Sequence, residues 1–170
     1  YGKASENVRV IRPMKDGVIA DFDATSAMVS AFIRRVLRGP RFLRPLVVIG
    51  VPSGITQVEK SAVIESALTT GARRVLLVNE PMAAALGANL PIEERRASMV
   101  VDIGGGTTDV AVISQSAIAY SECIRVAGDE MDEAIMQHVH KRFKLEIGPF
   151  EAERVKMELG SAFPLLHQYE

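Results

Sequence analysis

The spacing of hydrophobic residues in the first half of the chain changes between helix and strand periods. An apolar stripe at helical spacing follows Asp23, which predicts a helix that Asp23 caps. Two continuous apolar runs, at 46–51 and 75–78, are typical of strands buried on both faces of a parallel sheet. Thr56 and Glu59, between these runs, have the spacing of a capping box. The order strand, helix, strand predicts a right-handed parallel crossover.

The second half begins with strand patterns and ends with helical ones. Apolar runs at 99–103 and 110–113 predict two strands, and alternation over 118–126 predicts a third, antiparallel strand with one exposed face. Helical patterns follow at about 129–144 and 150–160. Together the two halves predict an α/β fold in which helices flank the sheets.

The composition of the chain limits the classes of protein to which it can belong. The 170 residues include 48% hydrophobic and 24% charged residues, which is typical of a folded globular chain. Lys and Arg number 20 against 21 Asp and Glu, so the net charge of -1 provides no overall basic field for nucleic acid, and we expect no nucleic-acid partner. The single cysteine, Cys123, and the lack of an apolar run of about 18 residues predict a cytoplasmic protein without a membrane-spanning helix.

The strongest chemical signal is the segment 102–109, with the sequence DIGGGTTD, between two predicted strands. Consecutive glycines let the backbone approach a ligand and direct N–H groups toward phosphate oxygens. Asp102, at the end of a strand, is a candidate to hold Mg²⁺ through water. Three glycines alone favour a glycine-rich hairpin without a ligand, but the flanking Asp and Thr residues reverse that preference. The segment is neither a P-loop nor a dinucleotide fingerprint, because it lacks Gly-Lys-Ser/Thr and leads into a strand.

Glu80 is a second candidate. It follows a predicted buried strand and begins a helix within Asn79-Glu80-Pro81, a position where open α/β sheets place their ligands. A carboxylate there can orient or deprotonate a water molecule. The alternative, favoured for Glu80 in isolation, is a carboxylate that only stabilises a helix N-terminus.

Several segments together resemble the MreB family of bacterial actin-like shape-determining proteins. They are 11–21 (IRPMKDGVIAD), 50–56 (GVPSGIT), 79–85 (NEPMAAA), 102–109 and 127–135 (AGDEMDEAI). The resemblance implies the actin-like ATPase (ribonuclease H-like) fold shared with heat-shock chaperones and sugar kinases. It implies parts of two subdomains, with 1–90 as the later part of the first and 91–170 as the early part of the second. ATP with Mg²⁺ is then expected in the cleft between them.

The resemblance also assigns roles to residues. The second phosphate loop corresponds to Gly104, Gly105, Gly106, Thr107 and Thr108. Asp102 is implied near Mg²⁺, and Glu80 and Thr107 are implied to position and activate the hydrolytic water. Glu153 and Lys156 match the adenosine-side helix of the family, whereas their pattern alone favours an exposed, charged helix face.

Phe42 and Leu43 match the membrane-inserting loop of the family. They are adjacent large apolar residues between Arg41 and Arg44, a combination that can dip into an anionic leaflet. This implies a peripheral location at the inner face of the cytoplasmic membrane. The alternative is a loop whose apolar pair packs on its own domain.

The function implied by the resemblance is an ATP-dependent cytoskeletal filament that organises cell-wall synthesis and maintains rod shape. Its partners would be further copies of itself, the membrane and the cell-wall synthesis machinery. Asn79-Glu80-Pro81 leaves a chaperone-type ATPase as one alternative. A non-catalytic, self-associating fragment is another, because the family's first phosphate loop is expected before Tyr1 and a later glycine-rich segment after Glu170. We therefore expect weak or absent ATP binding by residues 1–170 alone.

Overall fold

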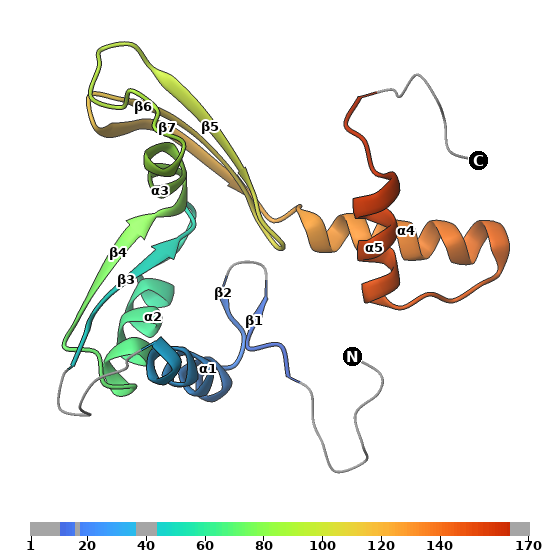
Figure 1. Cartoon of the computed structure of the whole chain (residues 1–170), viewed down its shortest axis with the longest axis horizontal. Coiled ribbons are helices and arrows are strands. Elements are labelled where there is room, and N and C mark those ends of the chain that lie inside the picture. The colour runs from blue at the N-terminus through green and yellow to red at the C-terminus, as the bar shows by residue number, and fades with distance from the viewer. Residues whose placement is uncertain (1–10, 16–17, 37–43, 164–170) are drawn as a thin grey trace.

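The computed structural model describes residues 11–15, 18–36 and 44–163, and these residues form the predicted α/β structure (Figure 1). The candidate membrane residues Phe42 and Leu43 lie outside the described residues. The elements in chain order are β1 (Met14–Lys15), β2 (Val18–Ile19), α1 (Phe22–Val36), β3 (Leu46–Val51), α2 (Gln57–Thr69), β4 (Arg74–Asn79), α3 (Glu80–Gly87), β5 (Ser98–Ile103), β6 (Thr108–Ser114), β7 (Ala117–Ile124), α4 (Gly128–Phe143) and α5 (Pro149–Leu159).

The predicted strand–helix–strand unit is confirmed in the first half. β3 and β4 pair in parallel, with Val47 opposite Val75, and α2 connects them. The capping box is present: the Glu59 N–H donates to Thr56 Oγ1 at 3.2 Å, and the Thr56 N–H donates to Glu59 Oε2 at 2.8 Å. The bond from the Thr56 N–H and a second bond from the Thr56 hydroxyl to the same oxygen, at 2.8 Å, lower the pKa of Glu59, and the backbone donor contributes most. The N–H groups of Thr56 and Glu59, at the start of α2, thus both have hydrogen-bond acceptors.

The predicted cap of α1 is wrong by two residues. The Ala24 N–H donates to Asp21 Oδ1 at 2.9 Å, so Asp21 is the residue that caps the helix. Asp23 already lies inside the first turn. An N-terminal cap must precede the helix, because its side chain accepts from N–H groups two or three residues further on.

The prediction that β3 is buried on both faces is also wrong within the described residues. Burial alternates along β3: Val51 is 3% exposed, whereas Leu46 and Val48 are 49% and 60% exposed. Leu76, the partner of Val48 in β4, is exposed on the same face. An apolar run indicates that both faces suit burial, but only the neighbouring elements decide which face is covered.

The second half contains a three-stranded antiparallel sheet in the order β5-β6-β7. α3 follows β4 directly and packs on β5 and β6, as Figure 1 shows. Between α3 and the sheet lies a core in which Ala85, Ala111 and Ile113 are fully buried. α3 therefore joins the parallel pair to the antiparallel sheet, and Glu80, which follows β4, lies near the turn of the β5–β6 hairpin.

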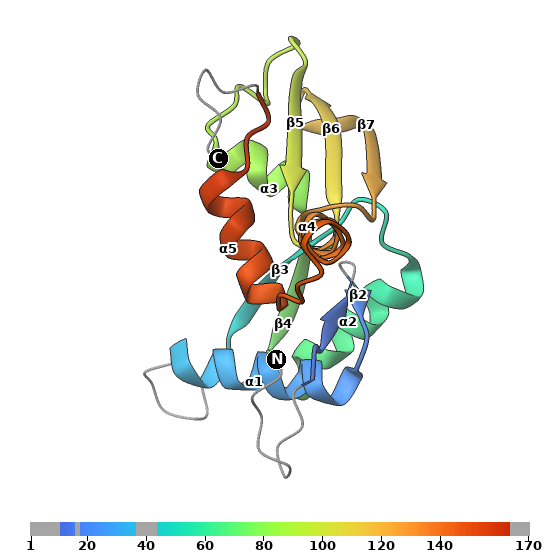
Figure 2. The ribbon, with the colours of Figure 1, turned by 90° about the vertical axis from the view of Figure 1, so that its right-hand side faces the viewer.

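α4 and α5 contact each other and lie beyond the end of the β5–β7 sheet (Figures 1 and 2). Ala152 of α5 is fully buried. α4 has an acidic start, with Asp129 and Glu130 in its first turn, and a basic end, with Lys141 and Arg142 in its last turn, which suits the helix dipole. Among the described residues, no helix has both the length and the apolar composition that crossing a bilayer requires.

Candidate functional site

A cavity of about 510 Å³ lies between the β1–β2 hairpin, the first helices and the β5–β6 turn. Its polar side is formed by most of the residues singled out from the sequence: Glu80, Asp102, Gly104, Gly105, Gly106 and Thr107. Asp109, Met14, Thr25, Val29, Gly50 and Pro52 are among the remaining lining residues. The cavity thus combines three carboxylates and a glycine turn with apolar walls, as small-ligand sites commonly do.

The glycine turn is held by its own backbone and by α4. The Gly104 N–H donates to the Thr107 carbonyl at 2.8 Å, which closes the turn. The carbonyls of Gly104 and Gly105 accept from the N–H groups of Gly128 and Asp129 at 3.1 and 2.7 Å. In a trans peptide the C=O and the following N–H point in opposite directions, so the N–H groups of Gly105 and Gly106 point away from α4. The turn thereby presents two backbone donors on the side opposite the helix.

Close contacts, one inside the turn and one between the turn and α4, explain two of the glycines. A Cβ on Gly128 would lie 3.3 Å from the Gly104 carbonyl oxygen and 3.3 Å from Lys156 Nζ. A Cβ on Gly104 would lie 3.3 Å from the Thr107 carbonyl oxygen. Thr108 lies outside the cavity lining, and its hydroxyl donates to the Val126 carbonyl at 2.8 Å. Thr108 therefore fastens the start of β6, while Thr107 is the threonine at the cavity.

Glu80 lies at the junction of β4 and α3, half-buried against Gly50. A Cβ on Gly50 would come within 3.2 Å of Glu80 Cγ, so the glycine makes room for the carboxylate. Burial raises the pKa of Glu80, and the charges of Asp109 and Asp102 raise it further. A carboxylate with a raised pKa accepts a proton more readily than an ordinary one, which suits a general base.

Asp109 was not among the predicted site residues, although it lines the cavity and is 1% exposed. Its Oδ1 accepts the Ser53 N–H at 2.8 Å, and its Oδ2 accepts from Cys123 Sγ at 3.3 Å. Burial raises the pKa of the Cys123 thiol, and the bond to Asp109 adds to the shift. Asp109 also stands opposite Asp102 in the β5–β6 ladder. The sequence signal for Asp109 was its position: it follows the glycine turn as Asp102 precedes it, so the two aspartates face each other across the hairpin.

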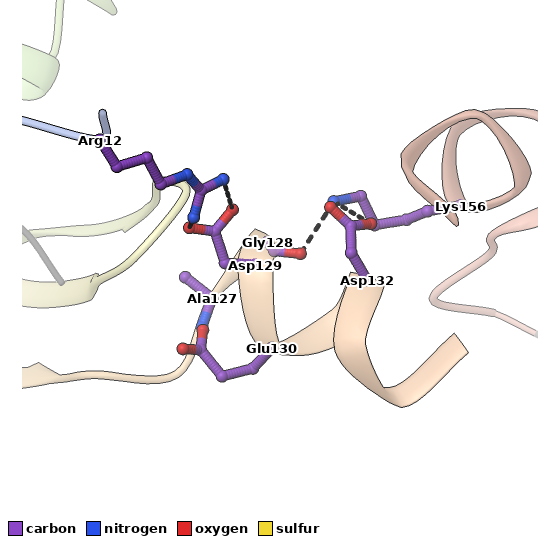
Figure 3. A network of polar contacts seen from close by, with 7 residues as sticks. All are labelled: Arg12, Ala127, Gly128, Asp129, Glu130, Asp132 and Lys156. Atoms are coloured by element: carbon purple, nitrogen blue, oxygen red, sulfur yellow. Dashed lines mark hydrogen bonds and ion pairs between the residues drawn. The ribbon is translucent and has the colours of Figure 1, made fainter. Parts of the chain in front are cut away.

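A second cavity, of about 370 Å³, lies on the α4–α5 side and contains Glu153. Its lining consists of Arg12, Asp129, Asp132, Glu133, Met136, Pro149, Phe150 and Glu153. Lys156 lies next to it rather than in its lining: Nζ is 2.8 Å from Asp132 Oδ1 and 2.9 Å from the Gly128 carbonyl (Figure 3). The structure therefore brings Glu153 and Lys156 to the α4 face of the glycine turn, separate from the larger cavity.

Arg12, Asp129 and Asp132 are polar residues of this region that the sequence reasoning missed. Arg12 Nη1 and Nη2 donate to Asp129 Oδ2 and Oδ1 at 2.8 and 3.3 Å, as Figure 3 shows. The same helix start is braced by Glu130, which accepts the Ala127 N–H at 2.8 Å. The acidic start of α4 was visible in the sequence, but its partner 117 residues away was not.

The donor set fits a magnesium ion held mainly by a phosphorylated ligand. Within the described residues, no group of three or more His, Cys, Asp or Glu side chains is arranged to hold a metal. Mg²⁺ is usually bound by one or two carboxylates together with phosphate oxygens and water. Asp102, half-buried at the cavity, can supply such a carboxylate.

The family model described as MreB/Mbl protein matches residues 1–170. The chain belongs to the MreB/Mbl family. The family resemblance found in the sequence is thereby confirmed. The chain is 53% identical to the cell shape-determining protein MreB of Escherichia coli K12 over 165 residues, which are 96% of this chain and 47% of that protein. This MreB/Mbl chain thus spans about half the length of the curated relatives that it matches.

Solved structures confirm the actin-like fold. Crystal structures of MreB5 of Spiroplasma citri bound to AMPPNP and to ADP match with TM-scores of 0.89 and 0.88 at 35% identity. They cover 98% and 97% of the MreB/Mbl chain, which in turn covers 50% and 49% of those chains. The MamK double helical filament matches with a TM-score of 0.77 at 24% identity over 86% of this chain and 46% of that one, a likeness of fold alone.

Proposed function

We propose that the chain is the nucleotide-binding part of an actin-like cytoskeletal filament protein that binds ATP with Mg²⁺ and maintains rod cell shape. The observation that carries the proposal is the larger cavity, which gathers Glu80, Asp102 and the glycine turn around one space of about 510 Å³. Full-length relatives named for cell shape determination support the cellular role. In this proposal, 1–90 and 91–170 belong to two subdomains that flank the nucleotide.

In the proposal, the glycine turn binds the phosphates of the nucleotide and the α4 side binds the nucleoside. The N–H groups of Gly105 and Gly106, together with Thr107, would bind the phosphates, because backbone donors that converge on one side of a turn suit anions. Thr108 would contribute by fastening the turn to Val126. On the α4 side, Glu153 and Lys156 would face the nucleoside. The binding of ADP and AMPPNP by MreB5 of Spiroplasma citri supports this assignment.

For hydrolysis, Glu80 and Thr107 would act on the attacking water. Glu80 would accept a hydrogen bond from the water and then its proton, a role that its raised pKa favours. The Thr107 side chain, beside the same cavity, would hold the water in place. Mg²⁺, when bound, neutralises the negative charge that develops on the phosphates. Asp102 would hold it through water, and the apolar walls would limit access of bulk water.

Filament formation, membrane binding and the organisation of cell-wall synthesis complete the proposal. Phe42 and Leu43, flanked by arginines, would insert into the inner face of the cytoplasmic membrane. The protein would self-associate into filaments, with further copies of itself as the first partners; it shares its fold with the MamK double helical filament. The cell-wall synthesis machinery would then be recruited along the polymer.

The test uses the intact protein with Mg²⁺-ATP. Calorimetry measures nucleotide binding, and sedimentation with electron microscopy measures polymers with and without ATP. We expect ATP-dependent filaments, and we expect Glu80→Gln to slow phosphate release by roughly 100-fold or more while binding is kept. Glu65→Gln, an exposed carboxylate change on α2, is the control and should leave both unchanged.

Two other results would refute the proposal in different ways. ATP-stimulated peptide binding without filaments would indicate a chaperone-type ATPase. Self-association that is independent of nucleotide, together with no heat of ATP binding, would indicate a non-catalytic assembly module.

A further inference from the structure

The ion pair between Arg12 and Asp129 connects two parts of the chain that lie far apart in sequence. The guanidinium donates to both carboxylate oxygens, at 2.8 and 3.3 Å, and the residues are 117 positions apart. Arg12 lies two residues before β1, whereas Asp129 lies in the first turn of α4. The contact therefore links the β1–β2 side of the molecule to the helix that supports the glycine turn (Figure 3).

Asp129 makes a second contact with its backbone. Its N–H donates to the Gly105 carbonyl at 2.7 Å, next to the bond from the Gly128 N–H to the Gly104 carbonyl. One residue thus holds the glycine turn through its main chain and Arg12 through its side chain. A shift of the first turn of α4 changes both contacts together, because a helix turn moves as a hydrogen-bonded unit.

The other side of this helix turn is also held. Lys156 Nζ donates to the Gly128 carbonyl at 2.9 Å and lies 2.8 Å from Asp132 Oδ1. The first turn of α4 is therefore fixed by α5 on one side and by Arg12 on the other. Of the two restraints, Arg12 is the one that comes from the first half of the chain.

We infer that Asp129 is a positioning residue that couples the Arg12 segment to the phosphate-binding glycine turn. When Arg12 is engaged, the N–H groups of Gly128 and Asp129 stay aligned with the Gly104 and Gly105 carbonyls, and the turn keeps its donors in place. When Arg12 withdraws, α4 loses one restraint and the turn loosens. The phosphate part of this inference rests on the proposed function, whereas the coupling between Arg12 and the turn does not.

Hydrogen exchange of the intact protein without nucleotide tests the coupling. Arg12→Ala should speed exchange of the Gly128 and Asp129 amides about twofold to fivefold, the range for an exposed ion pair, with amides in the middle of α4 unchanged. Arg154→Ala is the matched control, because it removes a similarly exposed 2.8 Å pair with Glu151 on α5. Equal exchange in the two variants would overturn the inference. So would faster exchange along the whole of α4, which indicates general destabilisation.

Two further variants separate this pair from other contacts. Arg12→Lys, which keeps the charge but not the two parallel bonds of the guanidinium, should restore part of the protection. In an Asp129→Asn background, Arg12→Ala should cause no additional change at the Gly128 amide; an additional change of the same size would show that Arg12 acts through another contact.

Binding of Mg²⁺-ADP then tests the phosphate part. Arg12→Ala should weaken the affinity about twofold to fivefold relative to Arg154→Ala. Faster exchange with unchanged affinity would overturn the link to phosphate binding. A wild-type protein that binds no adenine nucleotide would refute the proposed function, while the exchange result would still decide the coupling.

Discussion

Replacing Asp109 by alanine should measurably destabilise the protein. The carboxylate is 1% exposed and accepts the Ser53 N–H at 2.8 Å and the Cys123 thiol at 3.3 Å. Its removal leaves both donors without this acceptor. A hydrogen bond to a charged group contributes about 1.5–3 kcal/mol, and the longer bond from the weakly donating thiol contributes less.

The loss of these hydrogen bonds is partly offset, because Asp109→Ala also removes the charge repulsion between Asp109 and Glu80. The Asp109 charge is one of the causes that raise the pKa of Glu80, so its removal makes the ionised form of Glu80 less unfavourable. We therefore expect Asp109→Ala to lower the free energy of unfolding by about 1–2 kcal/mol, below the full value of the charged bond. Asp109→Asn keeps an oxygen for the Ser53 N–H and loses the charge, so its cost should be below about 1 kcal/mol.

Urea unfolding of the intact protein near neutral pH measures these differences, provided that the slope with urea concentration is unchanged. Glu93→Ala, an exposed carboxylate change in the connection before β5, is the control and should stay within about 0.5 kcal/mol of wild type. If Asp109→Ala is as stable as this control, the bond from Ser53 to Asp109 does not contribute to stability and the reasoning fails.

Three further changes test other parts of the structure. Ser116 has a φ of 60°, so Ser116→Gly should stabilise the β6–β7 turn by about 0.5–1 kcal/mol, measured by urea unfolding. Lys156→Met leaves the Asp132 carboxylate, whose side chain is 12% exposed, without its cation, and should cost about 2–3 kcal/mol in the same assay, less than for a fully buried pair. For Glu80, burial is the largest cause of the raised pKa, so the folded state holds a proton that the unfolded state has lost above its ordinary pKa of 4.5. Stability therefore falls as pH rises from there through the folded pKa, and Glu80→Gln should remove this fall.

Each of these has its own control. Ala117→Gly, at a strand position with negative φ, should destabilise the hairpin, so stabilisation by both glycines would contradict the turn argument. Asp132→Asn in the Lys156→Met background should recover part of the loss, and no recovery would show that packing rather than charge is responsible. For Glu80→Gln, unfolding free energies measured between pH 4 and 8 that still run parallel to wild type would contradict the assigned cause.

The elements and the glycine turn could be predicted because their signals are local. The capping box of Thr56 and Glu59, the strands on both sides of 104–107 and the helix starting near Asp129 all follow from residues within a few positions of one another. The place of Glu80 at a strand end and a helix start was also predicted, because both signals are local. That it lies at the same cavity as the glycine turn, which belongs to a different sheet, was decided by the tertiary structure.

The sequence by itself determined which segments become helices and strands, and which short motif carries the candidate chemistry. Only the tertiary structure decided that one face of β3 stays exposed, that Asp109 holds Ser53, and that Arg12 reaches Asp129. The physical reason is range: backbone propensity and side-chain periodicity act over a few residues, whereas burial and ion pairing depend on which distant surfaces meet. The carboxylates of Asp102, Asp109 and Asp129 look alike in the sequence, but they have different roles because the fold brings each one into contact with different residues.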